Sequence, residues 1–475
     1  MLLNRRNFSA ICSSAIIKPV IALSQSATEF PETRNLRLVR SSDAGAAELS
    51  DGYATQFRST PDLRAMCADA VAMQSSLRWA RATGRSFAVR SGGHCFEGFS
   101  QHNDMVIDVR EARQIEIDAD AGLVTIGSGV QVGPLLRQLA ASGFTIPAGT
   151  HSNVGMAGHT LGGGFGYFVR RDGLLIDHLV SATMVTADGD IVDASQTSHP
   201  DLFWALRGGG GGQFGIVATM TFRIQRETRL HWINIVEPVD ATRAAEILFL
   251  WQRWSVSSPR HLCTHLSISR RGESGFLIAL KGLSDGARGD VLQELKLLMR
   301  RKKDLHPTRV RSGTMDAILP HMLPPAKMPH ANLKSKSYLF SAPLDERGTL
   351  DFLKTLLSYP SATITTNFES LGGAMADVSA EETAFPHRDA ILIVHLQGNA
   401  GLLNENETPI NAAMIDMERV LAPRATGGVY VNYPDVSLAD WGQRYWSQNL
   451  ARLKAVKNAY DPDNVFDHTH SIARA

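Results

Sequence analysis

The sequence predicts an α+β fold with more than one domain, and three observations lead to this prediction. Its 475 residues exceed the usual size of one domain, and 44% of them are hydrophobic, so the chain can bury a large core. Residues 55–225 are rich in glycine and alternate short β-rich runs with helical patterns. From about residue 230 the glycine clusters stop and amphipathic helical patterns appear, which marks a second domain.

The elements expected in the first region follow from local composition and periodicity. The runs with the composition of strands are residues 86–89, 105–108, 123–126, 182–185 and 216–223. Residues 132–142 have helical spacing, with Leu135, Leu136 and Leu139 as the apolar positions. The turn sequence ADGD at 187–190 separates two strand-like runs at hairpin distance.

The second region, residues 226–425, has longer amphipathic segments. Its expected helices include residues 242–254 and 290–299, and its expected strands include residues 276–283 and 391–396. Residues 323–326 and 399–408 are predicted to be surface loops or linkers. The last segment, residues 426–475, returns to a compact pattern containing tyrosines, so we expect it to fold back onto the first domain.

The N-terminus resembles a bacterial twin-arginine export signal. The sequence NRRNF at 4–8 precedes a modestly apolar stretch and the small-residue run SQSA at 24–27. We therefore expect residues 1–27 to direct export to the periplasm or beyond. Lys18 and Pro19 interrupt the apolar stretch, so a non-functional signal on a cytoplasmic protein is the alternative. No other stretch approaches the ~20 apolar residues of a membrane span.

Charge and cysteine content exclude several kinds of partner. The chain has 48 Lys and Arg against 47 Asp and Glu, which gives no basic footprint for nucleic acid or an anionic membrane. Its four cysteines form no C-x-x-C pair, so no metal site is expected. These observations favour a small-molecule partner.

Three glycine clusters indicate a phosphate-bearing cofactor. They are RSGGH at 90–94, the segment 149–164 that contains GTHSNVGMAGH and GGG, and RGGGGG at 207–212. Backbone N–H groups in such clusters can converge on a pyrophosphate. A Rossmann site would need G-x-G-x-x-G after a first strand and an acidic residue about 20 positions later. That arrangement is missing from the sequence, which disfavours an NAD-dependent dehydrogenase.

Six longer motifs resemble the berberine-bridge-enzyme-like branch of the vanillyl-alcohol-oxidase superfamily, which has a PCMH-type FAD-binding domain. They are RSGGHCFEGFS at 90–100, PAGTHSNVGMAGHTLGGGFG at 147–166, FWALRGGGGGQFGIV at 203–217, TAFPHR at 383–388, YVNYPD at 430–435 and YDPDNVF at 460–466. The resemblance covers residues 61–472. It implies a two-part FAD-binding domain, residues 55–225 and 426–475. This domain encloses a substrate domain, residues 226–425, built on an antiparallel sheet covered by helices.

The resemblance also implies the residues that contact FAD. His94 matches the histidine that this family bonds to the 8α-methyl carbon of the flavin, and a neutral imidazole is a competent nucleophile. Many relatives attach the flavin a second time through a cysteine at the position of His151, so we expect one covalent bond here, or none. The other expected contacts are Arg90, Ser91, Gly92, Gly93, Cys95, Thr150, Ser152, Val154, Gly155, Gly158, His159, Gly162, Gly215, Ile216, Val217 and Asn464.

Oxidation of the substrate requires a group that removes a proton near the flavin. Tyr430 and Tyr433 match tyrosines that relatives place beside the substrate, and either is a candidate for the base. His395 is a third candidate, because relatives project a Gln or Glu toward the substrate from its position. Purely structural roles for these three residues, and a capping role for Asn464, are the alternatives.

The expected function is FAD-dependent oxidation of an alcohol, a sugar or a secondary metabolite. Val154 matches a position where, in this family, valine accompanies reaction of the reduced flavin with O2, so the resemblance implies an oxidase that releases hydrogen peroxide. The alternatives are a flavin dehydrogenase that uses a quinone or a protein as acceptor, and a flavin-binding protein with a repurposed site. The second alternative arises because His151 and His395 replace the residues expected at their positions.

Overall fold

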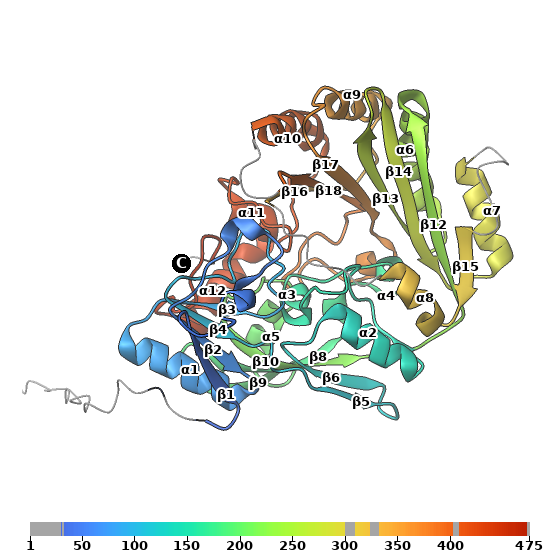
Figure 1. Cartoon of the computed structure of the whole chain (residues 1–475). Coiled ribbons are helices and arrows are strands. Elements are labelled where there is room, and N and C mark those ends of the chain that lie inside the picture. Colours follow the sequence, from blue (N-terminus) through green and yellow to red (C-terminus); the bar gives the residue numbers. More distant parts are fainter. Residues whose placement is uncertain (1–29, 31–32, 300–308, 324–331, 402–407, 473–475) are drawn as a thin grey trace, which may run out of the picture.

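The computed structural model describes residue 30 and residues 33–299, 309–323, 332–401 and 408–472. The predicted export signal and most of the two predicted loops lie outside the described residues. Figure 1 shows a lower body that holds the first region and the C-terminal segment, and an upper sheet that belongs to the second region.

The first region contains two main sheets. One has the strand order β1 (Leu36–Arg40), β2 (Leu63–Cys67), β4 (Met105–Asp108) and β3 (Phe87–Arg90), with β1 antiparallel to β2 and the other pairs parallel. Helix α1 (Ala70–Thr83) begins where the Asp69 carboxylate accepts from the N–H of Ala72, and it ends at Gly84 in the left-handed conformation. Strand β1 precedes residue 55, so this domain starts earlier than the expected boundary.

The second sheet is antiparallel, and four helices lie between its strands in the chain. Its order is β5 (Ile115–Asp118), β6 (Leu123–Gly127), β10 (Gly215–Arg223), β8 (Leu179–Thr186) and β9 (Ile191–Ser195). Helices α2 (Val132–Ala141) and α5 (Pro200–Leu206) are accompanied by the short elements β7 (Phe144–Thr145), α3 (Met156–Leu161), α4 (Val169–Asp172) and β11 (Gln225–Arg226). Each strand and helix predicted in this region is present, and the chain turns at residues 187–190 as predicted.

The second region forms one antiparallel sheet of seven strands. Their order is β15 (Val310–Gly313), β12 (Leu230–Asp240), β14 (Gly275–Ser284), β13 (Leu262–Arg271), β17 (Ile364–Ser370), β18 (Leu392–Asn399) and β16 (Leu333–Phe340). Helices α6 (Ala241–Ser257), α7 (Arg288–Met299), α9 (Glu346–Leu357) and α10 (Thr408–Leu421) bury one face in a core that includes Trp251, Phe352 and Phe368. Side chains alternate along a strand, so the opposite face carries the remaining, mostly polar side chains.

The C-terminal segment returns to the first region, as predicted. Its helices α11 (Trp441–Trp446) and α12 (Leu450–Tyr460) share a core with Phe203 and Trp204 of α5, and α8 (Met315–Met322) packs into the same core. The Lys457 ammonium is fully buried, lies 2.7 Å from the Asp461 carboxylate, and donates to the carbonyl oxygens of Gln213 and Phe466. These bonds fix the segment against the glycine-rich loops. In the described part of the chain, no helix has the length and apolar character needed to cross a membrane.

Candidate active site

A cavity of about 600 Å³ lies between the two domains. One wall is made by the three glycine segments of the first region, and the facing wall by the polar side of the seven-stranded sheet. Residues 430–434 of the C-terminal segment close a third side. The cavity therefore joins parts of the chain that are far apart in sequence.

Almost all of the predicted site residues line this cavity, including both tyrosines and His395. The exceptions are Arg90, Gly162, Ile216 and Asn464. Arg90 is buried beneath the loop that it begins, and Ile216 belongs to the core of the first region. Gly162 packs against the side chain of Asn432, while Asn464 forms a turn after α12 with φ of 53°. These four residues support the walls, and direct contact with a molecule in the cavity is not expected of them.

The glycine segments form a cradle for a flat, phosphate-bearing molecule. Gly92 and Gly155 lie back to back, because a Cβ on either one would overlap the backbone of the other. A Cβ on Gly158 would meet no atom within 4 Å, and one on Gly211 would meet only the Cα of Gly158 at 3.9 Å. Side chains at Gly158 and Gly211 would occupy the cavity itself. These residues fit the pyrophosphate and ring of FAD.

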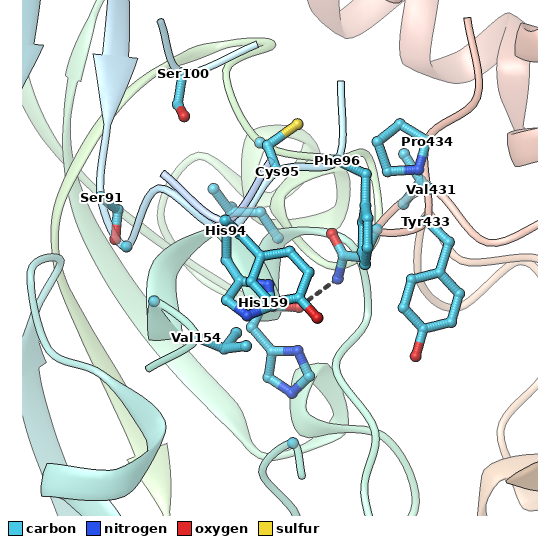
Figure 2. A pocket seen from close by; sticks show the side chains of 18 of the residues that line it. Ser91, His94, Cys95, Phe96, Ser100, Val154, His159, Val431, Tyr433 and Pro434 are labelled. Carbon is cyan, nitrogen blue, oxygen red and sulfur yellow. Dashed lines mark hydrogen bonds between the residues drawn. The ribbon is translucent and has the colours of Figure 1, made fainter. Parts of the chain in front are cut away.

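His94 has the properties of an attachment point for the flavin. Its Nε2 is buried and has no hydrogen-bond partner in the described structure, and burial lowers its pKa to about 3. The ring stacks on Tyr53, with centroids 3.7 Å apart and planes inclined by 19°. The imidazole is therefore neutral near pH 7, so a ring nitrogen keeps its lone pair for bonding. Figure 2 shows His94 on the side of Phe96 that is opposite Tyr433.

The neighbours of His94 are also uncharged or apolar. The His151 ring lies 6.0 Å from the His94 ring, and burial lowers the pKa of His151 and brings that of His159 to about 4. Burial raises the pKa of the Cys95 thiol, which disfavours the reactive thiolate. Val154 lines the same cavity as His94 and His159, and all three are labelled in Figure 2.

Tyr430 and Tyr433 use their hydroxyl groups differently. The Tyr430 hydroxyl accepts hydrogen bonds from the N–H of Gly164 at 2.9 Å and from the Asn432 amide at 3.0 Å. The Tyr433 hydroxyl donates to Oε2 of Glu369 at 3.3 Å. Burial raises the pKa of Tyr430, and burial together with the nearby Glu369 raises that of Tyr433 well above its ordinary value. Both phenols thus keep their protons near neutral pH, which favours hydrogen bonding over the predicted role of base.

His395 supports Tyr433 by stacking. The two rings lie 3.8 Å apart and are nearly parallel, at 9°. The Nε2 atom of His395 shares a hydrogen bond with the Ser335 hydroxyl at 3.1 Å, and burial lowers the pKa of His395 to about 3. A group with this pKa is a weak proton acceptor at pH 7, so the geometry favours a positioning role for His395.

The polar face of the seven-stranded sheet carries functional candidates that the sequence motifs did not indicate. Across neighbouring strands, His265 pairs with both Lys281 and Glu369, and all three line the cavity. Glu369 is only 6% exposed, and burial raises its pKa to about 8. The available signal was the set of polar residues at alternate positions 365, 367 and 369, the last of them three residues before Gly372 of the Gly372–Gly373 pair. Among the described residues, no group of three or more His, Cys, Asp and Glu side chains is arranged to hold a metal ion.

Comparison with known families gives two matches that bracket the substrate domain. Residues 61–195 match the "FAD binding domain" model, and residues 429–473 match the "Berberine and berberine like" model. Both matched segments contribute walls to the cavity. The two matched segments fall within residues 55–225 and 426–475, which the sequence motifs assign to the flavin domain.

Known proteins extend these matches over nearly the whole chain. The FAD-linked oxidoreductase YgaK of Bacillus subtilis is 32% identical over 441 residues, which cover 92% of this chain and 96% of YgaK. A berberine bridge enzyme variant in complex with (S)-reticuline has a TM-score of 0.85 and 22% identity, with 93% of this chain and 97% of that chain covered. Chitooligosaccharide oxidase has a TM-score of 0.83 and 21% identity, with the same coverage. The chain therefore belongs to the berberine bridge enzyme-like family of FAD-linked oxidoreductases.

Proposed function

We propose that this oxidoreductase is an oxidase of a small hydroxyl-bearing molecule, an alcohol or a sugar, with O2 as electron acceptor and hydrogen peroxide as product. The observation that carries the proposal is the pairing of two walls in one cavity: a cofactor cradle that includes His94 faces a sheet rich in hydrogen-bonding groups. We further propose that FAD is bonded covalently to His94. When bound, FAD supplies the two-electron acceptor for the oxidised carbon.

The facing sheet supports a polar substrate. Ser267, Asn367 and Gln397 line the cavity from three strands, and Lys281 is exposed on a fourth. The Ser267 hydroxyl donates to the Asn367 amide oxygen at 2.5 Å, and the Gln397 amide donates to the Tyr53 hydroxyl at 2.9 Å. Amide and hydroxyl groups have further capacity for hydrogen bonds, which substrate hydroxyls would satisfy on binding.

The choice of O2 over another acceptor is supported by Val154. Its small side chain lines the same cavity as His94, where a bulkier side chain would restrict access of O2 to a bound flavin. A dehydrogenase would differ in a simple observation, because its reduced flavin would reoxidise slowly in air.

The proposal is tested with purified holoprotein in two steps. Acid precipitation should leave the yellow colour with the protein pellet if FAD is covalent. The flavin is then mixed anaerobically with benzyl alcohol, glucose, a chitooligosaccharide and (S)-reticuline, and its absorbance is followed. Bleaching by an alcohol or sugar, then rapid recovery in air with release of peroxide, is expected. Bleaching without recovery in air would indicate a dehydrogenase, and no bleaching would contradict the proposed substrate class.

We also propose that residues 1–27 direct twin-arginine export. The test is a replacement of both Arg5 and Arg6 by Lys, with the protein followed by fractionation of a bacterial host. The unchanged chain should be found in the periplasm or medium, and the double variant in the cytoplasm. Equal distribution of the two proteins would contradict export by this route.

A further inference from the structure

Glu369 belongs to the polar wall of the cavity and has no role in the proposed function. It extends from β17, which has β13 on one side and β18 on the other. Two carboxyl side chains occur among the described residues that line the cavity, and Asp467, the other one, is exposed. Glu369 is thus the buried acid of this site.

Glu369 differs from the buried carboxylates that stabilise the fold. Asp108 accepts from two arginines, at 2.8 Å and 2.7 Å, and Asp461 accepts from a buried lysine at 2.7 Å. Glu369 accepts one hydrogen bond, of 3.3 Å, from the Tyr433 phenol. Its other neighbour, Nδ1 of His265 at 3.8 Å, is beyond hydrogen-bond distance and belongs to a ring whose pKa burial lowers to about 3. A structural carboxylate would be compensated by charge or by several donors, and this one is not.

We propose that Glu369 is the catalytic base that receives the hydroxyl proton of a primary or secondary alcohol during its oxidation in the cavity. This inference rests on the proposed function. FAD, when bound, would supply the acceptor for the hydride that leaves the carbinol C–H bond, and the proton released from the O–H bond would pass to the Glu369 carboxylate. The electron pair of the O–H bond then forms the second bond of the carbonyl product. The Tyr433 hydroxyl donates to the same carboxylate and orients it.

The surroundings of Glu369 suit this role. Burial raises its pKa to about 8, which lies close to neutral pH. A general base with such a pKa is basic enough to take a proton and is still partly deprotonated at the working pH. The titratable groups that face it are Tyr433, Tyr430, Tyr167, His265, Cys263 and, farther out, Lys281. Burial raises the pKa of the three phenols and of the thiol, and lowers that of His265, so these groups are neutral near pH 7.

The test compares holoenzyme carrying Glu369→Gln with the unchanged protein and with Glu97→Gln. Glu97 is the matched control, because burial raises its pKa to about 7 while its side chain lies outside the cavity lining. The first measurement is the infrared absorption of protonated carboxyl groups as the pH is raised. A signal lost at about pH 8 should be absent in Glu369→Gln and present in Glu97→Gln.

The second measurement is anaerobic flavin reduction by the best alcohol or sugar of the substrate panel, as a function of pH. For the unchanged protein the rate should rise with pH as Glu369 loses its proton. Glu369→Gln should lower the plateau rate by roughly 10²-fold or more and remove this rise, whereas Glu97→Gln should preserve both. If Glu369→Gln does not retain flavin, Glu369→Asp replaces it. That variant should keep the rise with pH at a reduced rate.

The outcomes separate this inference from the proposed function. Equal reduction rates and equal pH profiles in Glu369→Gln and the unchanged protein would overturn the role of Glu369 alone. Persistence in Glu369→Gln of the signal lost at about pH 8, as distinct from the Glu97 signal lost at about pH 7, would do the same. A flavin that no alcohol or sugar reduces in the unchanged protein would overturn the proposed function first, and this inference with it.

Discussion

The stacked pair of His94 and Tyr53 keeps an uncharged imidazole at the edge of the cofactor cradle. A protonated imidazole has no lone pair with which to bond a carbon atom, so burial favours the neutral form that the proposed attachment at His94 needs. Stacking restrains the ring on one side, and the unpartnered Nε2 is the atom with free bonding capacity.

We expect His94→Ala to abolish covalent attachment of FAD. After acid precipitation the flavin of this variant should be found in the supernatant, or the purified protein should be colourless. His151→Ala is the control, because its ring lines the same cavity but is not expected to bond the flavin. Flavin that stays with the His94→Ala pellet would contradict the assignment.

Tyr433→Phe should shift the pH profile of flavin reduction toward higher pH. The Tyr433 hydroxyl lowers the pKa of Glu369 by donating to it, so its removal raises that pKa further. A hydrogen bond to a charged group contributes about 1.5–3 kcal/mol, and this one is long, so a shift of about one pH unit is expected. The measurement is the anaerobic reduction rate across pH. An unchanged midpoint would show that the hydroxyl does not act through Glu369.

The raised pKa of Glu369 also has a consequence for stability. Its folded pKa of about 8 exceeds the ordinary value of 4.5, so between these pH values the folded state binds a proton that the unfolded state lacks. The contribution is fully present below about pH 4.5 and is lost as the pH rises through 8. Unfolding measured at several pH values should show that Glu369→Gln loses less stability between about pH 4.5 and pH 8 than the unchanged protein does. Parallel pH curves for the two proteins would contradict the raised pKa.

At the scale of elements, the contact between two glycine loops sets the shape of the cradle. Gly92→Ala would force its methyl group into the backbone at Gly155, and overpacking of this kind costs about 1–3 kcal/mol. We expect loss of bound flavin, measured as absorbance per protein, together with a lower Tm. Gly289→Ala in α7 is the control, since its Cβ would meet no atom within 4 Å. Full flavin content in Gly92→Ala would show that the loops can separate without harm.

The sequence predicted elements well where a local pattern was sufficient. Strand β4 has the predicted bounds, and the predicted helix 132–142 differs from α2 by one residue. The sequence did not predict which residues of distant strands pair with one another. Glu369 meets His265 through the pairing of β17 with β13, about a hundred residues earlier in the chain, and no local pattern specifies that pairing.

The site, like the fold, was predicted where a local motif was sufficient and missed where three-dimensional packing decides. The glycine motifs predicted where the cavity lies, because glycine has no side chain and lets the backbone approach a ligand closely. They did not indicate which way each side chain turns, so Arg90 and Ile216, on either side of these loops, were expected at the cofactor and are instead buried in the walls. The proton-accepting role expected of Tyr433 depends on its pKa, which follows from three-dimensional burial.

At the scale of the whole molecule, the Lys457–Asp461 pair connects the C-terminal segment to the glycine-rich loops. Lys457→Met would leave the Asp461 carboxylate buried without its cation, which costs about 3–5 kcal/mol. We expect a lower free energy of unfolding in a denaturant titration. Arg347→Ala is the control: it removes an exposed pair with Asp351, with 85% and 38% side-chain exposure, that is worth about 0–1 kcal/mol. Equal losses in the two variants would contradict this account.

The return of the C-terminal segment also sets an order of events during synthesis. Tyr430 and Tyr433 complete a cavity whose cradle begins at residue 91, so the ribosome makes more than three hundred residues between the first wall and the last. Protein domains generally fold as units while the chain emerges, but this flavin domain cannot close until the inserted sheet has been made. We therefore expect the cavity to stay incomplete until the C-terminal segment has been made, and capture of the cofactor to be one of the last steps in biogenesis.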